Sequence, residues 1–175
     1  MLILGLDPGS LHTGYGLLEK RGSALSTLDA GRFSCPRGQA LPARLAHLVA
    51  CLGELLARHP PDVVVLETPF HGMNVRSLVV LAQARGALLA AVAAQGVEIC
   101  EYSPAEVKSA VTGNGRADKE QVAKMVRLLL SLDNRVLAAD ATDALALAIC
   151  CAQRLRLDRL ATAAIVPRPR PASGG

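Results

Sequence analysis

Apolar segments separated by short turns open the chain. Residues 1–7, Met-Leu-Ile-Leu-Gly-Leu-Asp, are apolar up to the last position, which is typical of a fully buried strand. Further strands are predicted over residues 14–20 and 24–33, with a turn at residues 21–23 between them. Because only short turns join the three segments, we expect them to form an antiparallel meander.

The rest of the chain alternates between helical and strand patterns. Apolar residues at helical spacing run from Leu41 to Arg58, and the sequence His-Pro-Pro at 59–61 ends the predicted helix. Two more strands are expected over 62–67 and 97–102, and the remaining helices over 74–95, 104–111, 118–130 and 138–156. This order predicts an α/β fold, with a mixed five-stranded sheet that begins with three antiparallel strands and has helices on both faces.

The predicted helix over 74–95 has more apolar residues than one face can hold, so we expect it to be covered on two sides. One side would cover the sheet, and the other needs another helix or a second subunit. The stretch from 78 to 97 contains Gln83, Arg85 and Gln95, which makes it too polar for a membrane span. We therefore expect no membrane association.

One domain accounts for most of the chain. The 175 residues are 51% hydrophobic, enough for a single core, and no internal linker divides them. We expect a domain over residues 1–156. The remaining segment, 157–175, is rich in proline and arginine near its end and is predicted to be a disordered basic tail.

Charge and cysteine usage narrow the functional class. A formal net charge of +4 is compatible with nucleic-acid binding without requiring it. The five cysteines have no CxxC spacing, which argues against zinc and against a disulfide framework. The N-terminus lacks the basic segment of a signal peptide, so we expect a cytoplasmic protein.

Four acidic residues carry the candidate chemistry. Asp7 and Glu67 end predicted strands, and Asp140 and Asp143 lie three apart at the start of an Ala/Leu-rich helix. Strand-end acids and a helical pair can converge, and clustered carboxylates favour hard cations such as Mg²⁺. Each acid alone also has a structural explanation without chemistry. Asp7 could be a turn residue, Glu67 an exposed strand end, and the helical pair a complement to the helix dipole. Together they indicate a metal-dependent nuclease.

A second group of residues suits a nucleic-acid partner. Phe70 follows Glu67 in a loop rich in Pro and Gly, and exposed aromatic rings stack on opened bases. Lys119 follows a Gly-Asn-Gly-Arg loop at a helix start, a place that suits a phosphate. The ordinary alternatives are a core phenylalanine and solvated surface charges. The basic candidates are Lys108, Arg116, Lys119, Lys124 and Arg127, with Arg76 near Phe70.

Six motifs follow one another along the chain. They are Asp7-Pro8-Gly9-Ser10, Thr13-Gly14-Tyr15-Gly16, Glu67 with Phe70, Gln83-Ala84-Arg85-Gly86, Gly113-Asn114-Gly115 with Lys119, and residues 139–146, Ala-Asp-Ala-Thr-Asp-Ala-Leu-Ala. Taken together and in this order, they resemble the RuvC family of Holliday-junction resolvases, which have an RNase H-like fold. The resemblance covers about residues 1–155, and Asp143 is the acidic form of a position that is His in some relatives.

The resemblance implies a homodimer that binds a four-way DNA junction and nicks two opposite strands symmetrically, leaving 5′-phosphate and 3′-hydroxyl ends. It also implies a branch-migration helicase complex as a partner. Carried over by position, the four acids are the catalytic metal-binding tetrad. Phe70 matches the junction-core aromatic, and Lys108 and Lys119 match DNA-contacting lysines. The helix containing Gln83, Arg85 and Gly86 resembles the dimer helix.

These expectations define a mechanism and its competitors. Asp7 would bridge two Mg²⁺ or Mn²⁺ ions, with Asp143 on the side of the attacking water and Glu67 and Asp140 on the side of the leaving oxygen. Three alternatives remain open: an RNase H-like nuclease for linear duplex or RNA, a non-catalytic junction-binding scaffold, and a small ATPase built on the Asp7 loop.

Overall fold

A single mixed sheet organises the computed structural model, which describes residues 1–68, 74–132 and 136–165, with 156–165 described by their backbone alone. The strand order is β3-β2-β1-β4-β5. Strands β1, β2 and β3 pair antiparallel, whereas β1, β4 and β5 run parallel, which confirms the predicted sheet. The strands are β1 (Leu2–Asp7), β2 (His12–Arg21), β3 (Ala24–Ser34), β4 (Val63–Glu67) and β5 (Glu98–Tyr102).

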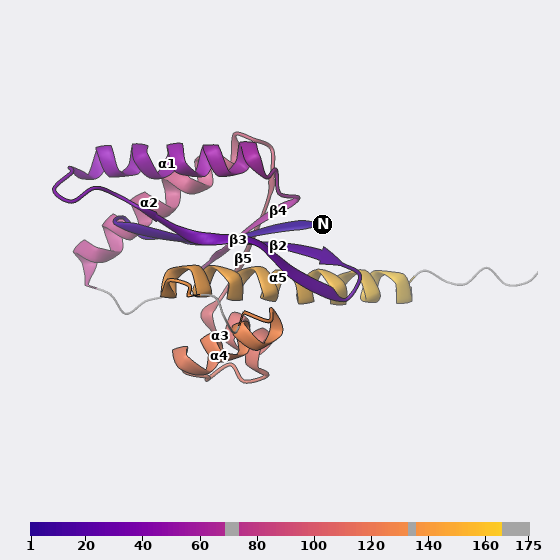
Figure 1. Ribbon diagram of the computed structural model, residues 1–175. Coiled ribbons are helices and arrows are strands. Elements are labelled where there is room, and N and C mark those ends of the chain that lie inside the picture. The colour runs from indigo at the N-terminus through magenta and orange to yellow at the C-terminus, as the bar shows by residue number, and fades with distance from the viewer. Residues whose placement is uncertain (69–73, 133–135, 166–175) are drawn as a thin grey trace, which may run out of the picture.

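Helices cover both faces of the sheet (Figure 1). On one face lie α1 (Leu41–Arg58) and α2 (Val75–Ala93). On the other lies α5 (Ala139–Ile165), with α3 (Pro104–Thr112) and α4 (Lys119–Leu129) packed beneath it. The arrangement confirms the predicted layers.

Helix α5 extends to Ile165, so the predicted helix end at 156 lies too early. The domain boundary at 156 and the disordered tail after it stay predictions. Leucine and alanine dominate this extension, and both favour helix. The rest of the predicted tail, 166–175, lies outside the described residues.

Successive side chains of each strand pack alternately into two hydrophobic cores, one on each face of the sheet. On β1, Leu4 packs into the core under α1 and α2, whereas Ile3 packs into the core under α5. Val65 of β4 also belongs to the core under α5. Because successive side chains of a strand point to opposite faces, Asp7 and Glu67 share the phase of Ile3 and Val65. Both acids therefore point to the face that α5 covers.

Glycines let α5 lie directly on the sheet. A Cβ atom at Gly5 would overlap the carbonyl oxygen of Ala144, and one at Gly14 would overlap the carbonyl oxygen of Asp140. Gly16 lies against the helix in the same way. Gly5 pairs with Gly16 across β1 and β2, so two neighbouring positions of the sheet have no side chain, and α5 packs in the space that this leaves.

α2 is the most exposed of the apolar helices. By length and composition it could cross a membrane, with a mean hydropathy of 1.5 over a window that is 17% buried. One helix of this kind is weak support for a span, because helices of soluble proteins pass the same test. Its exposed apolar face is also what a partner helix would cover. The expectation of no membrane association stays a prediction.

We expect Gly5→Ala to lower the free energy of unfolding by about 1–3 kcal/mol or more, because an added methyl group must push α5 away from β1. The midpoint of urea denaturation measures this change. Gly53→Ala in α1 is the matched control, since a Cβ there meets nothing within 4 Å and alanine favours helix. Equal midpoints for the two variants would contradict the proposed close packing.

Candidate active site

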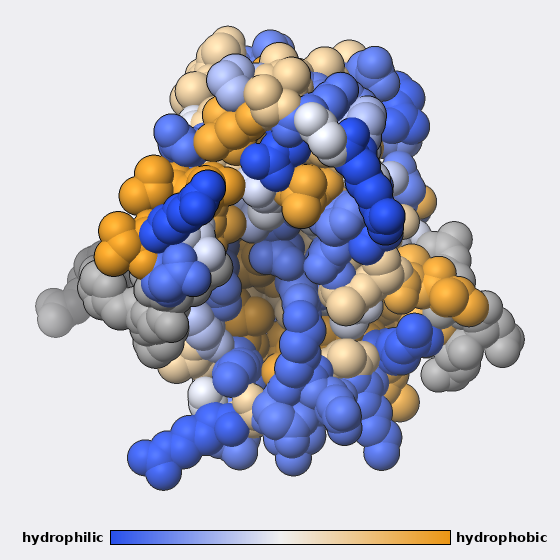
Figure 2. Space-filling model, turned by 90° about the vertical axis from the view of Figure 1, so that its left-hand side faces the viewer, coloured by the Kyte–Doolittle hydropathy of each residue, from blue (hydrophilic) through white to orange (hydrophobic). Residues whose placement is uncertain are grey.

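Three of the predicted acids line one pocket at the carboxyl ends of β1 and β4. The pocket has a volume of about 290 Å³, and Asp7, Glu67 and Asp143 line it together with Lys108 and Lys119. Apolar side chains of α3, α4 and α5 complete its wall. Figure 2 views the molecule from this side, with hydrophilic residues gathered along the middle of the face. Three of the four acids therefore line one pocket, and their role as metal ligands stays a prediction.

Asp7 lies at the centre of the charge cluster. Burial raises the pKa of its carboxyl to about 7, and the charges of Asp143, Asp140 and Glu67 contribute to this rise, while Lys119 opposes it. The fourth acid, Asp140, is thus close enough to act on Asp7, although it is not among the residues that line the pocket. Near neutral pH the carboxyl of Asp7 is therefore only partly protonated, and a cation can displace its proton.

Glu67 lies in a milder environment. Burial and the charge of Asp143 raise the pKa of Glu67, whereas Lys108 and Lys119 lower it. The two lysines come from α3 and α4, which form the wall opposite the strand ends. The pocket therefore combines acids from the sheet and α5 with cations from the helices beneath.

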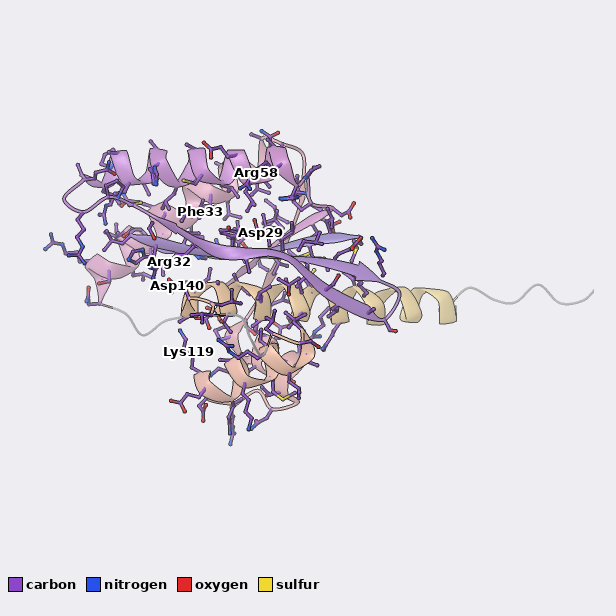
Figure 3. The ribbon with its side chains drawn as sticks, viewed as in Figure 1. Asp29, Arg32, Phe33, Arg58, Lys119 and Asp140 are labelled. Atoms are coloured by element: carbon purple, nitrogen blue, oxygen red, sulfur yellow. The ribbon has the colours of Figure 1, made fainter. Side chains whose placement is uncertain are left out.

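Two cations make ion pairs with the acids of α5. Lys119 Nζ lies 2.6 Å from Asp143 Oδ2, and this hydrogen bond raises the pKa of Lys119. Arg32 Nη1 of β3 lies 3.5 Å from Asp140 Oδ2. Figure 3 labels Arg32, Asp140 and Lys119 at the same end of α5, with Asp140 between the two cations. Each acid of the pair is thus neutralised from a different side.

The donor set suits a hard divalent cation, but the side chains do not form a closed ligand cluster as they stand. Among the described residues no three His, Cys, Asp or Glu side chains are close enough to hold a metal ion together. Asp143 and Asp140 are each paired with a cation, Lys119 and Arg32 respectively. Carboxylate oxygens are the ligands that Mg²⁺ and Mn²⁺ prefer, and burial together with three neighbouring acids raises the pKa of Asp7.

The predicted DNA-contacting residues fall into three groups. Lys108 and Lys119 line the pocket. Arg76, in the first turn of α2, and Arg116, in the loop before α4, do not line it. Phe70 lies outside the described residues.

The start of α4 differs from the expected phosphate site. Asp118 caps the helix, and its Oδ1 accepts a hydrogen bond of 2.8 Å from the backbone N–H of Gln121. A carboxylate already occupies the place that a phosphate would take. Lys119 therefore acts through its side chain in the pocket and not through the helix terminus.

The predicted dimer residues differ in how they lie on α2. Gln83 is exposed, and Gly86 is open enough that an added Cβ would meet nothing within 4 Å. Arg85 is turned into its own subunit, where its Nε donates to the carbonyl oxygen of Glu67 over 3.3 Å and its Nη2 pairs with Glu101. The side chain of Arg85 is 15% exposed. The guanidinium group of Arg85 thus contacts the end of β4 within its own chain, where Glu67 lies, and is largely buried there.

Arg32 is the site residue that sequence reasoning missed. Its β3 position pairs with Gly14 of β2, and Gly14 pairs with Asp7 of β1. The signal that could have found it is the register of the meander, which places Arg32 two strands from Asp7 at the same level. That register depends on a shift between Leu17 and Leu18, which no local pattern reveals.

The family model for crossover junction endodeoxyribonuclease RuvC matches residues 3–151 of the chain. A RuvC of Trichlorobacter lovleyi is 46% identical over 150 residues, which cover 86% of this chain and 84% of the relative. The chain belongs to the RuvC family. Members of this family are metal-dependent nucleases.

Solved RuvC structures have the same fold. Thermus thermophilus RuvC is 32% identical, with a TM-score of 0.82, and the match covers 90% of this chain and 97% of that one. The same protein in complex with a Holliday junction substrate is matched with a TM-score of 0.84 at 31% identity, over 90% of this chain and 96% of that one. The predicted RNase H-like fold is confirmed.

We expect Asp7→Asn to stabilise the metal-free protein at pH 8 by about 1–3 kcal/mol. The unfolded chain binds the Asp7 proton with a pKa near its ordinary 3.8, and the folded chain with a pKa of about 7. Between these values the folded state holds more protons, so stability falls as pH rises from about 4 to about 7 and stays low above that range.

Urea denaturation in EDTA at pH 5 and pH 8 measures the effect. The gain should be smaller at pH 5, where folded Asp7 already carries a proton. Glu54→Gln, a carboxyl-to-amide change on an exposed part of α1, is the matched control and should have little effect at either pH. An equal gain for Asp7→Asn at both pH values, or none at pH 8, would contradict the charge cluster.

Proposed function

We propose that this protein resolves four-way DNA junctions by nicking two opposite strands at symmetric positions, leaving 5′-phosphate and 3′-hydroxyl ends. The observation that carries the proposal is the pocket in which Asp7, Glu67 and Asp143 face Lys108 and Lys119, in a chain of the RuvC family. An acidic centre with a cationic wall suits metal-assisted hydrolysis of a phosphodiester.

The chain's own residues divide the work. Asp7, Glu67, Asp140 and Asp143 would hold two Mg²⁺ or Mn²⁺ ions, which when bound stabilise charge on the phosphate and lower the pKa of a water molecule. Lys108 and Lys119 would hold the DNA strand against the ends of β1 and β4. Arg85 fixes the carbonyl group of Glu67 and so limits movement of that acid.

The substrate calls for two active sites, and α2 provides a surface for a homodimer. Val75 and Val79 are 76% and 50% exposed. Gln83 and Gly86 continue the same stripe at helical spacing. Apolar residues on one helix face of this kind are what a second copy would cover.

We expect Val79→Glu to shift the protein from dimer to monomer, because a charge would be buried at the centre of the stripe. Sedimentation velocity over a range of concentrations measures the change. Leu128→Glu is the matched control, since Leu128 is 66% exposed on α4, away from α2. A monomeric wild-type protein, or a Val79→Glu variant that remains dimeric, would contradict this interface.

One further partner and a cellular compartment are also proposed. A branch-migration helicase complex is proposed to deliver the junction, and the cytoplasm is the proposed compartment. The thiols of Cys35, Cys51, Cys100, Cys150 and Cys151 suit a reducing environment.

We expect paired nicks in a mobile four-way junction and none in a linear duplex of the same sequence, in the presence of Mg²⁺ or Mn²⁺ and not in EDTA. Denaturing gels of end-labelled strands measure the nicks and their symmetry. Asp7→Asn should abolish cleavage and leave junction binding nearly intact, because it removes the central carboxylate without changing the fold.

Each remaining outcome selects another function. Equal cutting of the linear duplex would indicate a general RNase H-like nuclease. Tight junction binding without nicks under either metal would indicate a scaffold. Wild-type cleavage by the Asp7→Asn variant would refute the role assigned to that acid.

A further inference from the structure

Strand register places Arg32 beside Asp140, at the edge of the acid cluster. Asp7, Gly14 and Arg32 lie in one row across β1, β2 and β3. Neighbouring strands are about 4.8 Å apart, so the backbones at Asp7 and Arg32 are separated by only about 10 Å. Gly14 between them has no side chain, and the backbone of Asp140 lies directly over it. Arg32 therefore borders the acid cluster because of the fold and not by chance.

The side chain of Arg32 points to the same face as Asp7. Phe33, its neighbour, packs into the core under α1 and α2 and stacks on Tyr15 with ring centroids 4.8 Å apart. Residues on either side of Phe33 must then face α5, and the contact between Arg32 and Asp140 agrees with this.

Polar groups continue outward from Arg32 on the same face. His12 and Ser34 form the last pair of β2 and β3 and are both exposed, with His12 Nδ1 3.2 Å from Ser34 Oγ. Arg32, His12 and Ser34 thus form a polar edge next to the pocket. This polar edge lies on β2 and β3, whereas Lys108 and Lys119 lie on α3 and α4.

Stability does not explain the ion pair between Arg32 and Asp140. The two side chains are 40% and 33% exposed, and the distance of 3.5 Å is long for a charged pair. An ion pair as exposed as this one adds little to stability. A guanidinium group beside an acid that must hold a metal ion competes with that ion, so its position calls for a function.

We propose that Arg32 is an additional contact to the DNA backbone, which grips a phosphate of the cleaved strand from the side opposite Lys108 and Lys119. This inference rests on the proposed function. When Asp140 turns to a divalent ion, the guanidinium is released from its carboxylate partner and presents its donors to the strand. Its planar fork matches a phosphate as well as it matches a carboxylate.

Charge balance supports a cation on this side. A phosphate that approaches four acids is repelled unless positive groups border its path. With lysines on one side alone, the strand would be held at one edge of the pocket. Arg32 supplies the second edge, so that a strand crossing the pocket is bound on both sides.

The test measures junction binding as a function of salt concentration. All proteins carry Asp7→Asn, so that the DNA stays uncut while Mg²⁺ is present, and fluorescence anisotropy gives the association constant at several KCl concentrations. Arg32→Gln should bind several-fold more weakly. Its slope of log K against log[KCl] should become shallower by about 0.9 for each phosphate that the variant no longer neutralises.

Two controls separate charge from position. Arg32→Lys should keep most of the slope, because it keeps the charge. Arg21→Gln makes the same change as Arg32→Gln at the far end of β2, where Arg21 pairs with Glu19, and should leave slope and affinity unchanged.

An Arg32→Gln variant with the slope and affinity of Arg21→Gln would overturn the proposal. This holds even if Arg32→Gln slows cleavage when Asp7 is present, since Arg32 would then only position Asp140. The proposed function is tested separately: it fails if the protein with Arg32 intact binds linear duplex as tightly as the junction. The difference in salt slope between the Arg32→Gln and Arg21→Gln variants can be measured on either DNA, so the two failures are distinguishable.

Discussion

The direct contact of α5 with β1 and β2 determines the geometry of the site. Gly5, Gly14 and Gly16 remove the side chains that would otherwise keep the helix away from the sheet. The helix can then begin over Gly14, which pairs with Asp7. The packing buries Asp7 and brings Asp143 and Asp140, in the first turns of α5, near the end of β1, and burial and these two charges raise the pKa of Asp7.

The same packing creates an electrostatic conflict. Burial and three neighbouring acids make the ionised form of Asp7 unfavourable in the metal-free protein. Lys119 offsets part of this conflict and pairs with Asp143, while Arg32 pairs with Asp140. Such a cluster of acids lowers the free energy of unfolding and raises the affinity for cations. The basic residues at its border attract the phosphates that the acids would repel.

The sequence predicted most of what depends on local pattern. The helix from Leu41 to Arg58 has the predicted bounds, because its apolar spacing and the following prolines are local signals. Asp7 and Glu67 were recognisable because each ends an apolar strand. The convergence of the acids could be expected from their places at strand ends and at a helix start, but the distances between them could not.

What the sequence did not predict depends on contacts between distant segments. Arg32 enters the site through the register of three strands, and Arg85 turns to the carbonyl oxygen of Glu67 because α2 crosses beside β4 and β5. The cap of α4 by Asp118 was a local signal that pointed away from a phosphate. The end of α5 was placed too early, at 156, although leucine and alanine continue at high frequency up to Ile165.

The central claim is that acids from β1, β4 and α5 form one metal site. Anomalous diffraction from crystals grown with Mn²⁺ tests this claim directly. We expect manganese peaks bordered by Asp7, Glu67, Asp140 and Asp143, with Lys119 and Arg32 moved away from their carboxylate partners. Manganese bound elsewhere, with both ion pairs intact at saturating Mn²⁺, would contradict the claim.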